Sequence, residues 1–325
     1  MAEAPLKTIG LSTGYRAKRE KIVIARNMDA QLHAGELTCL LGPNGAGKST
    51  LLRTLCGFLP AIEGVVEALG KPVDKYSPGD LARVISVVLT DRLSVANMTA
   101  EELVGMGRAP YTGFMGRLTA RDRAVTRHAI ELVGVEHLAK RAVATLSDGE
   151  RQKVMIAKAL AQETPVILLD EPTAFLDYPS KVEIMRLLHQ LAHSKGIAVL
   201  LSTHDLELAL QIADRIWLID KKLGLTSGVS EDLALNGSLA TYFEREGVEF
   251  DPYAGLFRIA RKSTRPVRLR GNGRRYAMTA KALRRTGFTE GETGPYIIAT
   301  DTELSIDSIP CGSIEALIDH LEQRG

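Results

Sequence analysis

Long apolar runs are missing from this chain of 325 residues. No stretch approaches the roughly 20 apolar residues that a helix needs to cross a bilayer. The opening segment, MAEAPLKTIG, also lacks the basic and apolar regions that begin a secretory signal. We therefore expect a cytoplasmic protein, and any role at a membrane has to come through a partner.

Cysteine is scarce, and the net charge is small. The three cysteines, Cys39, Cys56 and Cys311, form no CxxC pair, so we expect buried free thiols in a reducing compartment. The formal net charge of +2 gives no indication of a partner. With 45% hydrophobic and 25% charged residues, the composition is that of an ordinary globular protein. The length predicts two domains, or one large domain with an appendage.

Short apolar runs alternate with helical patterns through most of the chain. Such runs are typical of strands that are covered on both faces, and the alternation predicts an α/β core. Residues 92–145 instead predict several helices, two of which begin at the caps Thr99-x-x-Glu102 and Thr119-x-x-Asp122. The expected strands of the core are residues 37–41, 84–89, 166–169 and 197–201.

The last part of the chain differs from the rest in its charge. Residues 256–289 hold eleven Arg or Lys and no Asp or Glu, whereas residues 290–325 hold eight acidic residues and one arginine. The pattern predicts a small α/β module whose first helix covers residues 276–288. The basic run could bind nucleic acid or anionic lipid. We expect it instead to pair with the acidic stretch, and we expect no nucleic acid as a partner.

These patterns divide the chain into two predicted domains. The first is an α/β domain of residues 1–250, with a mixed or parallel sheet and an inserted helical subdomain at about 92–162. The second is an accessory α/β module of residues 251–325.

Residues 42–49, GPNGAGKS, match the phosphate-binding pattern G-x-x-x-x-G-K-[ST]. Its glycines let the backbone aim N–H groups at an anion, and the helix that follows adds positive charge at its N-terminus. Lys48 is expected to reach the β- and γ-phosphates of a nucleoside triphosphate, and Ser49 to ligate Mg²⁺. The predicted nucleotide-binding residues of this loop are Gly42, Pro43, Asn44, Gly45, Ala46, Gly47, Lys48, Ser49 and Thr50.

Two carboxylates end the apolar run VILLDEPT at residues 166–173. Ligands of such sheets lie at the carboxyl ends of the strands, so Asp170 is a candidate Mg²⁺ partner. Glu171 could accept a proton from an attacking water or orient it, and Pro172 ends the strand. The pair could equally be a helix cap followed by a surface residue, but the phosphate loop favours the catalytic interpretation.

Two further stretches lead from these motifs to a known family. LSDGERQ, at residues 146–152, resembles the signature of the nucleotide-binding subunits of ABC transporters, and Ser147 and Gly149 match its positions. TAFLD, which ends at Asp177, resembles the D-loop of the same family. These matches occur in the order that the family shows.

The resemblance also assigns two residues outside the phosphate loop and the signature. LSTHD places His204 at the end of a strand, where the family has its switch histidine. Tyr15 resembles the aromatic residue that stacks on adenine. The likeness covers about residues 6–250.

The family resemblance implies a mechanism that needs two subunits, ATP and Mg²⁺. In a head-to-tail homodimer, Ser147 and Gly149 of one subunit would contact the γ-phosphate held by Lys48 of the other. Glu171 with His204 would promote hydrolysis, and loss of the γ-phosphate contacts would release the dimer. The other implied partners are transmembrane permease subunits and, indirectly, a substrate-binding protein, at the cytoplasmic face of the inner membrane.

Two positions depart from the family pattern. Asp148 stands where the signature usually has glycine, so its carboxylate should repel the triphosphate unless it caps the following helix or points away. We expect it to cap that helix, with its carboxylate turned away from the γ-phosphate. The family's metal-contacting Gln is also missing, and Thr90 or Asp91 takes its place. We take Thr90 as a candidate metal residue.

RAPYTGFMGRLTARDR, at residues 108–123, resembles a segment of the ATPases of iron-siderophore, haem and cobalamin importers. An iron complex, siderophore or haem, is therefore the first expected cargo and cobalamin the second. Two other classes stay open. One is a soluble ABC-type ATPase of cluster assembly without a permease, and the other is an ATP-gated module that does not hydrolyse.

HQLAH, at residues 189–193, places two histidines at i and i+4 on an expected helix, a spacing that can hold zinc. Gln190 stands where a metalloprotease has its Glu, and no third ligand is evident in the sequence. We therefore expect a solvated helix face here. Trp217 is expected in the core.

Overall fold

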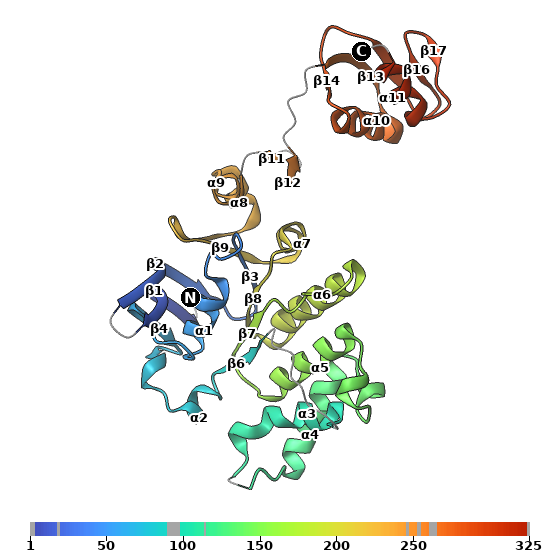
Figure 1. Ribbon diagram of the computed structural model, residues 1–325. Coiled ribbons are helices and arrows are strands. Elements are labelled where there is room, and N and C mark those ends of the chain that lie inside the picture. Colours follow the sequence, from blue (N-terminus) through green and yellow to red (C-terminus); the bar gives the residue numbers. More distant parts are fainter. Residues whose placement is uncertain are drawn as a thin grey trace. The chain divides into compact units, whose positions relative to one another are not determined.

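The computed structural model describes residues 4–17, 20–89, 98–113, 115–244, 247–251, 255–259 and 265–323 (Figure 1). The chain divides into two compact units, Met1–Glu244 with Pro252–Leu256, and Arg245–Asp251 with Phe257–Gly325. Within the described residues, no helix combines the length and the apolar character needed to cross a bilayer.

The first unit contains a six-stranded sheet in the order β10-β9-β3-β8-β7-β6. The five strands from β9 to β6 pair in parallel, and β10 is antiparallel to β9. Every residue of β3, β7 and β8 is buried, which explains why these strands are continuous apolar runs. The strands are β3 (Leu37–Leu41), β6 (Ile85–Val88), β7 (Val166–Asp170), β8 (Ala198–Ser202), β9 (Arg215–Asp220) and β10 (Gly224–Gly228).

An antiparallel sheet in the order β2-β1-β4-β5 also belongs to this unit, and the sequence patterns did not predict it. Its long strand β1 pairs with β2 on one side and β4 on the other, with register shifts that break the alternation of buried and exposed residues. The strands are β1 (Leu6–Ala17), β2 (Glu20–Leu32), β4 (Glu63–Ala68) and β5 (Lys71–Pro72).

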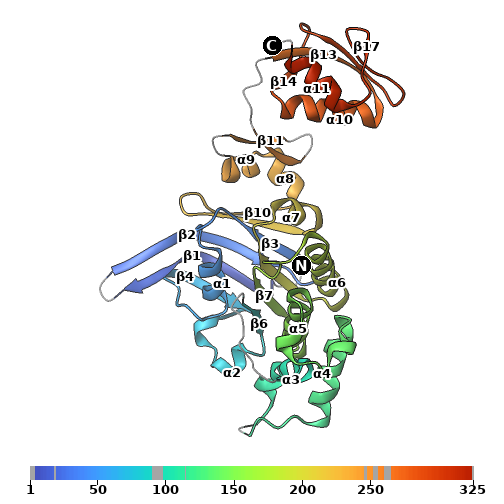
Figure 2. The same cartoon turned by 45° about the vertical axis from the view of Figure 1, so that its right-hand side comes forward.

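Helices cover both faces of the six-stranded sheet. The helix α1 (Lys48–Leu55) lies between the two sheets, and α6 (Tyr178–Lys195) lies on the opposite face (Figures 1 and 2). Trp217 of β9 is fully buried, as expected, in the core that the two sheets share with α1. Shorter helices complete the unit: α2 (Pro78–Leu81), α7 (Leu206–Ile212), α8 (Ser230–Leu235) and α9 (Ser238–Phe243).

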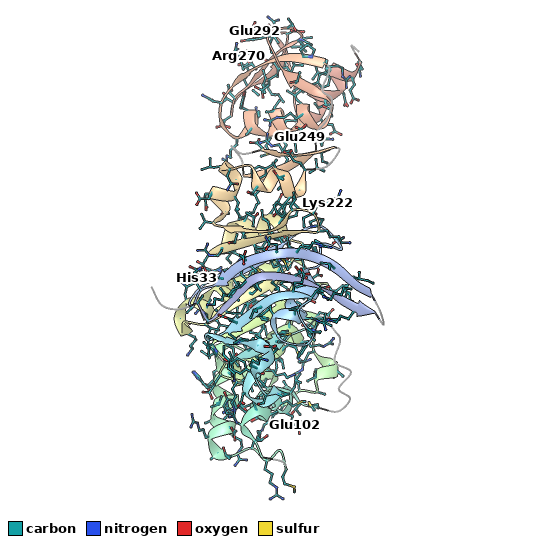
Figure 3. The ribbon with its side chains drawn as sticks, turned by 90° about the vertical axis from the view of Figure 1, so that its left-hand side faces the viewer. His33, Glu102, Lys222, Glu249, Arg270 and Glu292 are labelled. Carbon is teal, nitrogen blue, oxygen red and sulfur yellow. The ribbon has the colours of Figure 1, made fainter. Side chains whose placement is uncertain are left out.

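The segment between β6 and β7 is called the helical insertion here, and its described residues are mostly helical. The capping boxes predicted at Thr99 and Thr119 are confirmed, because each threonine accepts a hydrogen bond from the backbone of the third residue on while that residue's carboxylate bonds back. Glu102, one of these carboxylates, is labelled in Figure 3, as is His33 in the turn that leads into β3. The insertion contains α3 (Ala100–Gly105), the 3₁₀ helix η2 (Met106–Tyr111), α4 (Ala120–Leu132), η3 (Glu136–Leu138), η4 (Val143–Thr145) and α5 (Asp148–Ala161).

The second unit is a small α/β fold with its own apolar core. Its five-stranded sheet has the order β14-β13-β15-β16-β17, in which β13 is parallel to both neighbours. The strands are β13 (Arg265–Gly271), β14 (Phe288–Glu290), β15 (Tyr296–Ala299), β16 (Leu304–Ile306) and β17 (Ile309–Pro310), with β11 (Val248–Asp251) and β12 (Leu256–Ile259) as a separate pair.

The helices of this unit are α10 (Gly273–Arg285) and α11 (Ile314–Glu322), and the predicted boundary of the first was wrong. The helix ends at Arg285, before Gly287 adopts a positive φ of 85°. Phe288 therefore lies in β14 rather than in the helix, and its ring is buried in the core.

The basic run of the second unit is held by several kinds of contact. Arg258 pairs with Asp251, which precedes the basic run and is not part of the acidic stretch, so the expected pairing with residues 290–325 stays a prediction. Arg265 and Arg268 instead donate to backbone carbonyls and lie over the rings of Phe288 and Tyr296. Arg268 and Arg270 are exposed positions of β13, and Arg270 is labelled in Figure 3.

The cysteines are free, but only two of them are buried. Burial raises the pKa of the Cys39 thiol and raises that of Cys56 to about 11. Cys311 is partly exposed, so the expectation of three buried thiols was wrong for this residue. It lies after β17, at the edge of the small second core, where less chain is available to cover it.

Candidate functional site

The glycine-rich loop joins β3 to α1, and its backbone has little room for side chains. Gly45 and Gly47 have φ values of 76° and 105°, which favour glycine. A Cβ atom on Gly42 would lie 2.3 Å from the carbonyl oxygen of Ile219. The first N–H groups of α1 point toward the loop, as they do at the start of any helix, and Gly47 at the N-cap has no side chain to cap them. The loop can therefore hold an anion.

Lys48 is buried at the base of this loop, with a side chain held close to the backbone. Its Nζ atom donates to the carbonyl oxygens of Gly42, at 2.8 Å, and Pro43, at 3.4 Å. Burial lowers the pKa of the ammonium group, whereas the carboxylates of Glu171 and Asp170 act to raise it. The cation is thus positioned at the loop with two carboxylates near it.

A chain of hydrogen bonds joins the first turn of α1 to the carboxyl ends of the adjacent strands β7 and β8. Asp170, at the end of β7, accepts from the Ser49 hydroxyl at 3.2 Å and from the Ser202 hydroxyl at 2.7 Å. The Ser202 hydroxyl in turn accepts from the backbone N–H of Glu171 at 2.9 Å. Oxygen atoms of Ser49 and Asp170 therefore lie together beside Lys48, and such oxygens are the ligands that Mg²⁺ prefers.

Ser202 is a residue of this site that the sequence reasoning missed. It ends β8, two residues before His204, in the same LSTHD stretch. The sequence signal that could have identified Ser202 was a small hydroxyl residue at the end of a buried strand. Its importance depends on the strand order, which places β8 between β3 and β7.

Glu171 and His204 face each other at the edge of the site. The Nδ1 atom of His204 lies 3.5 Å from Oε2 of Glu171, and both side chains are partly exposed. Glu171 has a φ of 47°, a left-handed conformation that is uncommon for a residue with a side chain. A carboxylate in this place can receive a proton from a water molecule, and the imidazole can orient it.

Tyr15 lies on β1 beside the start of α1. Its hydroxyl is 3.1 Å from the Thr50 hydroxyl, and the side chain is 43% exposed. An exposed ring next to the phosphate loop is able to stack on a flat base. The antiparallel sheet, which the sequence did not predict, is the element that carries this residue.

The signature residues lie at the start of α5, and one prediction about them was wrong. We expected Asp148 to cap this helix, but Ser147 is the N-cap and forms a capping box with Glu150. Asp148 is the first helical residue, and its carboxylate lies 3.4 Å from the Arg151 guanidinium. Both residue types cap well, so the backbone position, with extended φ and ψ at Ser147, decided which of them does so.

Gly149, in the first turn of α5, lies near the start of α6, where Asp177 is the N-cap. A Cβ atom on Gly149 would be 3.7 Å from the Ser180 hydroxyl, in the first turn of α6. Asp177 is the N-cap of α6 and accepts from the backbone N–H of Ser180. Hydrogen bonds with the side chain and then the backbone of Ser180 lower the pKa of its carboxyl group. The structure therefore gathers the signature and the D-loop at one surface.

The remaining metal candidate, Thr90, lies outside the described residues, as does the alternative Asp91.

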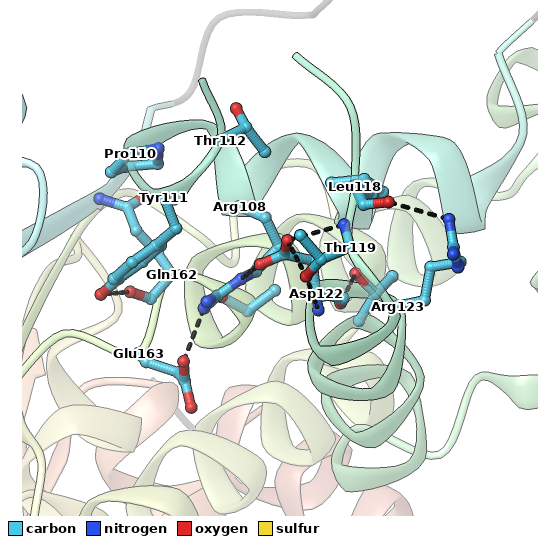
Figure 4. Close-up of polar contacts among 12 residues, drawn as sticks. Arg108, Pro110, Tyr111, Thr112, Leu118, Thr119, Asp122, Arg123, Gln162 and Glu163 are labelled. Atoms are coloured by element: carbon cyan, nitrogen blue, oxygen red, sulfur yellow. Dashed lines mark hydrogen bonds and ion pairs between the residues drawn. The ribbon is translucent and has the colours of Figure 1, made fainter.

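Arg108, from the RAPY stretch, is buried in a network of polar contacts (Figure 4). Its guanidinium donates to Asp122 at 3.0 Å, to Glu163 at 2.7 Å and to the carbonyl of Ala161 at 2.7 Å, and it lies over the Tyr111 ring. Hydrogen bonds from Thr119, with a smaller contribution from Arg108, lower the pKa of Asp122 to about 2. Ionised Asp122 thus stabilises the fold above its ordinary pKa near 4, and this contribution is lost as the pH falls toward 2.

This network connects the helical insertion with the sheet. The Gln162 amide, just after α5, donates to the carbonyls of Ala82 and Ile85 at 2.6 and 3.2 Å. The backbone carbonyl of Gln162 accepts from the Tyr111 hydroxyl, and Arg83 donates to the carbonyl of Pro110. Because Ile85 begins β6, the contacts bind the insertion to the edge strand of the sheet.

Comparison with known proteins finds relatives whose family agrees with this arrangement of residues. The family model described as ABC transporter matches residues 25–174. An uncharacterized ABC transporter ATP-binding protein of Methanocaldococcus jannaschii is 41% identical over 78% of this chain and 86% of its own length.

Two further relatives have names that state a transported compound. The hemin import ATP-binding protein HmuV of Streptomyces coelicolor is 36% identical over 77% of this chain and 88% of its own length. The iron(3+)-hydroxamate import ATP-binding protein FhuC of Bacillus subtilis is 34% identical over 74% of this chain and 87% of its own length.

A solved structure supports the same assignment. The dimeric structure of a bacterial ABC transporter cassette covers 66% of this chain and 94% of its own, with 28% identity and a TM-score of 0.57. The loop, the paired carboxylates and these relatives together establish the assignment: this chain belongs to the ABC transporter family, as one of its ATP-binding and ATP-hydrolysing proteins.

Proposed function

We propose that this chain is the ATPase subunit of an importer for an iron complex, either a siderophore or haem. The observation that carries the ATPase part is the network from Ser49 through Asp170 and Ser202 to Glu171, beside Lys48. The names of the hemin and iron(3+)-hydroxamate import proteins support the cargo.

In this proposal the phosphate loop binds the triphosphate of ATP. Lys48 exchanges its contacts with the carbonyls of Gly42 and Pro43 for the β- and γ-phosphates, which compete as stronger acceptors because they are charged. The other loop residues of the predicted set, from Gly42 to Thr50, surround the phosphates, and Tyr15 stacks on the adenine.

The donor set also fits Mg²⁺. The Ser49 hydroxyl and the Asp170 carboxylate lie within 3.2 Å of each other, so both oxygens can reach one small cation. Bound there, Mg²⁺ neutralises negative charge on the β- and γ-phosphates. Thr90 remains a candidate for the same ion.

Glu171 is the proposed base of the reaction, and His204 its positioning partner. The carboxylate receives the proton of the attacking water, and the imidazole at 3.5 Å holds the carboxylate in place. Lys48 stays on the phosphate side and stabilises the charge that develops there.

A second copy of the chain completes each site in this proposal. Ser147 and Gly149 lie at the exposed start of α5, with Asp177 nearby on the same surface. A head-to-tail homodimer would bring this surface of one copy to the phosphate loop of the other, because a two-fold axis pairs two different patches in both directions. The dimeric cassette among the solved relatives supports such an assembly.

Permease subunits are proposed to bind an apolar pocket of about 950 Å³ beside β6. Phe58, just after α1, lines the pocket and is 61% exposed, and Val73, Leu81 and Ile85 also line it. The amide of Gln162 reaches the same wall, so a bound permease would touch the network that holds the helical insertion. Through this contact the chain would lie at the cytoplasmic face of the membrane, and a substrate-binding protein would act through the permease.

Purification from native membranes tests this function. We expect the chain to be recovered with a membrane-spanning partner, and ATP hydrolysis in reconstituted vesicles to rise when an iron complex and its binding protein are added. Stimulation of ATP hydrolysis by cobalamin but not by iron complexes would show that cobalamin is the cargo. Recovery from the soluble fraction alone would favour a soluble ABC-type ATPase of cluster assembly.

Asp148→Gly is expected to leave ATP hydrolysis unchanged or to raise it. The carboxylate is exposed and pairs with Arg151, so its removal costs little stability and takes a negative charge away from the signature. Steady-state ATPase assays on the purified transporter would measure the change, with Asp148→Asn as the matched control. A loss of about tenfold or more, or 1.4 kcal/mol in activation free energy, would show that Asp148 acts in turnover.

A further inference from the structure

Two histidines on α6 converge on one carboxylate of another element. His189 and His193 lie one helical turn apart, and Asp214 precedes β9. The Nε2 atom of His193 is 3.0 Å from each carboxylate oxygen of Asp214, and Nε2 of His189 is 3.5 Å from Oδ1. The sequence showed no third ligand beside the two histidines, and the tertiary structure supplies one.

The spacing of the three groups is that of ligands around a single cation. Four ligands at about 2.0–2.1 Å from a tetrahedral zinc ion lie roughly 3.3 Å from one another. The two His–Asp distances, 3.0 and 3.5 Å, fall on either side of this value, and the three ligand atoms all lie within 4.8 Å of one another. From this geometry we propose that His189, His193 and Asp214 bind a divalent cation of the zinc class.

The carboxylate is oriented for this role by the backbone. Oδ2 of Asp214 accepts a hydrogen bond of 2.7 Å from the N–H of Leu37, the first residue of β3. Such a bond fixes the orientation of a metal ligand. Oδ1 lies 3.0 Å from Nε2 of His193 and 3.5 Å from Nε2 of His189, so it can serve as the ligand atom. The rings are tilted by 37° with centroids 4.3 Å apart, so they do not stack face to face.

The donor types select the kind of cation. Two imidazole nitrogens with one carboxylate oxygen suit zinc and neighbouring transition metals, whereas Mg²⁺ and Ca²⁺ prefer oxygen ligands alone. The side chains of His189 and His193 are 37% and 50% exposed, so a cation can enter from solvent and a water molecule can be its fourth ligand.

This site is separate from the nucleotide site. Leu37 begins β3 and Asp214 directly precedes β9, whereas Gly42, Glu171 and His204 follow the carboxyl ends of their strands. In a parallel sheet the starts of the strands lie on the side opposite to their carboxyl ends. A cation here would join α6, which begins beside the D-loop residue Asp177, to the starts of β9 and β3.

Metal binding by the full chain, produced without a polyhistidine tag, tests the proposal. The protein is freed of metal with a chelator and titrated calorimetrically with zinc chloride, without nucleotide and with excess Mg²⁺ to occupy the oxygen ligands at Ser49 and Asp170. We expect one equivalent of zinc, and an affinity at least about tenfold lower in His189→Gln and His193→Gln, since even an outer-shell partner contributes this much. His137→Gln, which alters an exposed histidine of η3, is the matched control and should bind like the wild type.

A second readout separates a metal site from a merely structural contact. Zinc should raise the melting temperature of the wild type and of His137→Gln but not of the two variants at the site. Bound Co²⁺ should give the intense visible absorption of a tetrahedral centre only where both histidines are present. Absence of stoichiometric zinc binding in the wild type, or equal binding in the His189 and His193 variants, would overturn the proposal and leave an ordinary hydrogen-bonded pair.

Discussion

Glu171→Gln is expected to lower the turnover of ATP by at least about a hundredfold, because general base catalysis contributes that much or more. Glutamine keeps the shape of the side chain and can still bond to His204, but it cannot take a proton from water at neutral pH. ATP binding should persist, since Lys48 and the loop are untouched. The variant should therefore accumulate as an ATP-bound dimer, measured by light scattering with and without ATP.

Two further variants show whether this result has the proposed cause. Glu231→Gln, at an exposed position of α8, should hydrolyse ATP like the wild type. Lys48→Ala should lose both hydrolysis and the ATP-dependent dimer, because the triphosphate is no longer held. Near-normal turnover by Glu171→Gln would show that another group receives the proton.

Arg108→Met is expected to destabilise the first unit by about 3 kcal/mol, because its removal leaves the buried carboxylate of Asp122 without its cation. Asp122 is buried beside the guanidinium, and Glu163 contacts it at 2.7 Å. For a unit of this size the loss corresponds to a melting temperature lower by roughly 6–12 °C. Differential scanning calorimetry of the purified chain would measure it.

The controls for Arg108 separate charge from geometry. Arg108→Lys keeps the charge but cannot make the forked contacts to Asp122, Glu163 and Ala161 together, so an intermediate loss is expected. Arg121→Met, at an exposed position of α4, should change the melting temperature little. If Arg108→Met unfolds like Arg121→Met, the network does not hold the insertion to the sheet.

Local patterns were sufficient for much of the fold and the phosphate loop. The runs that became β3, β7 and β8 are apolar at nearly every residue because both faces of these strands are covered. The capping boxes at Thr99 and Thr119 likewise depend on residues three positions apart.

The antiparallel sheet was missed for a physical reason that its pairing shows. Register shifts in β1 break the period of two, so buried and exposed residues do not alternate as they do in a regular strand. The cap of α5 could not be assigned from the sequence either. Serine and aspartate are both good caps, and only the backbone conformation decides whether Ser147 or Asp148 takes this role.

By itself, the sequence determined the family, the nucleotide loop and the carboxylate pair, because short spacings and strand contexts carry that chemistry. Only the tertiary structure decided which distant residues meet. Strand order places Ser202 between Asp170 and the Glu171 backbone, and packing of α6 against the sheet brings Asp214 to His189 and His193. These contacts join residues more than twenty positions apart, and no local pattern encodes them, since they follow from how strands and helices pack around one core.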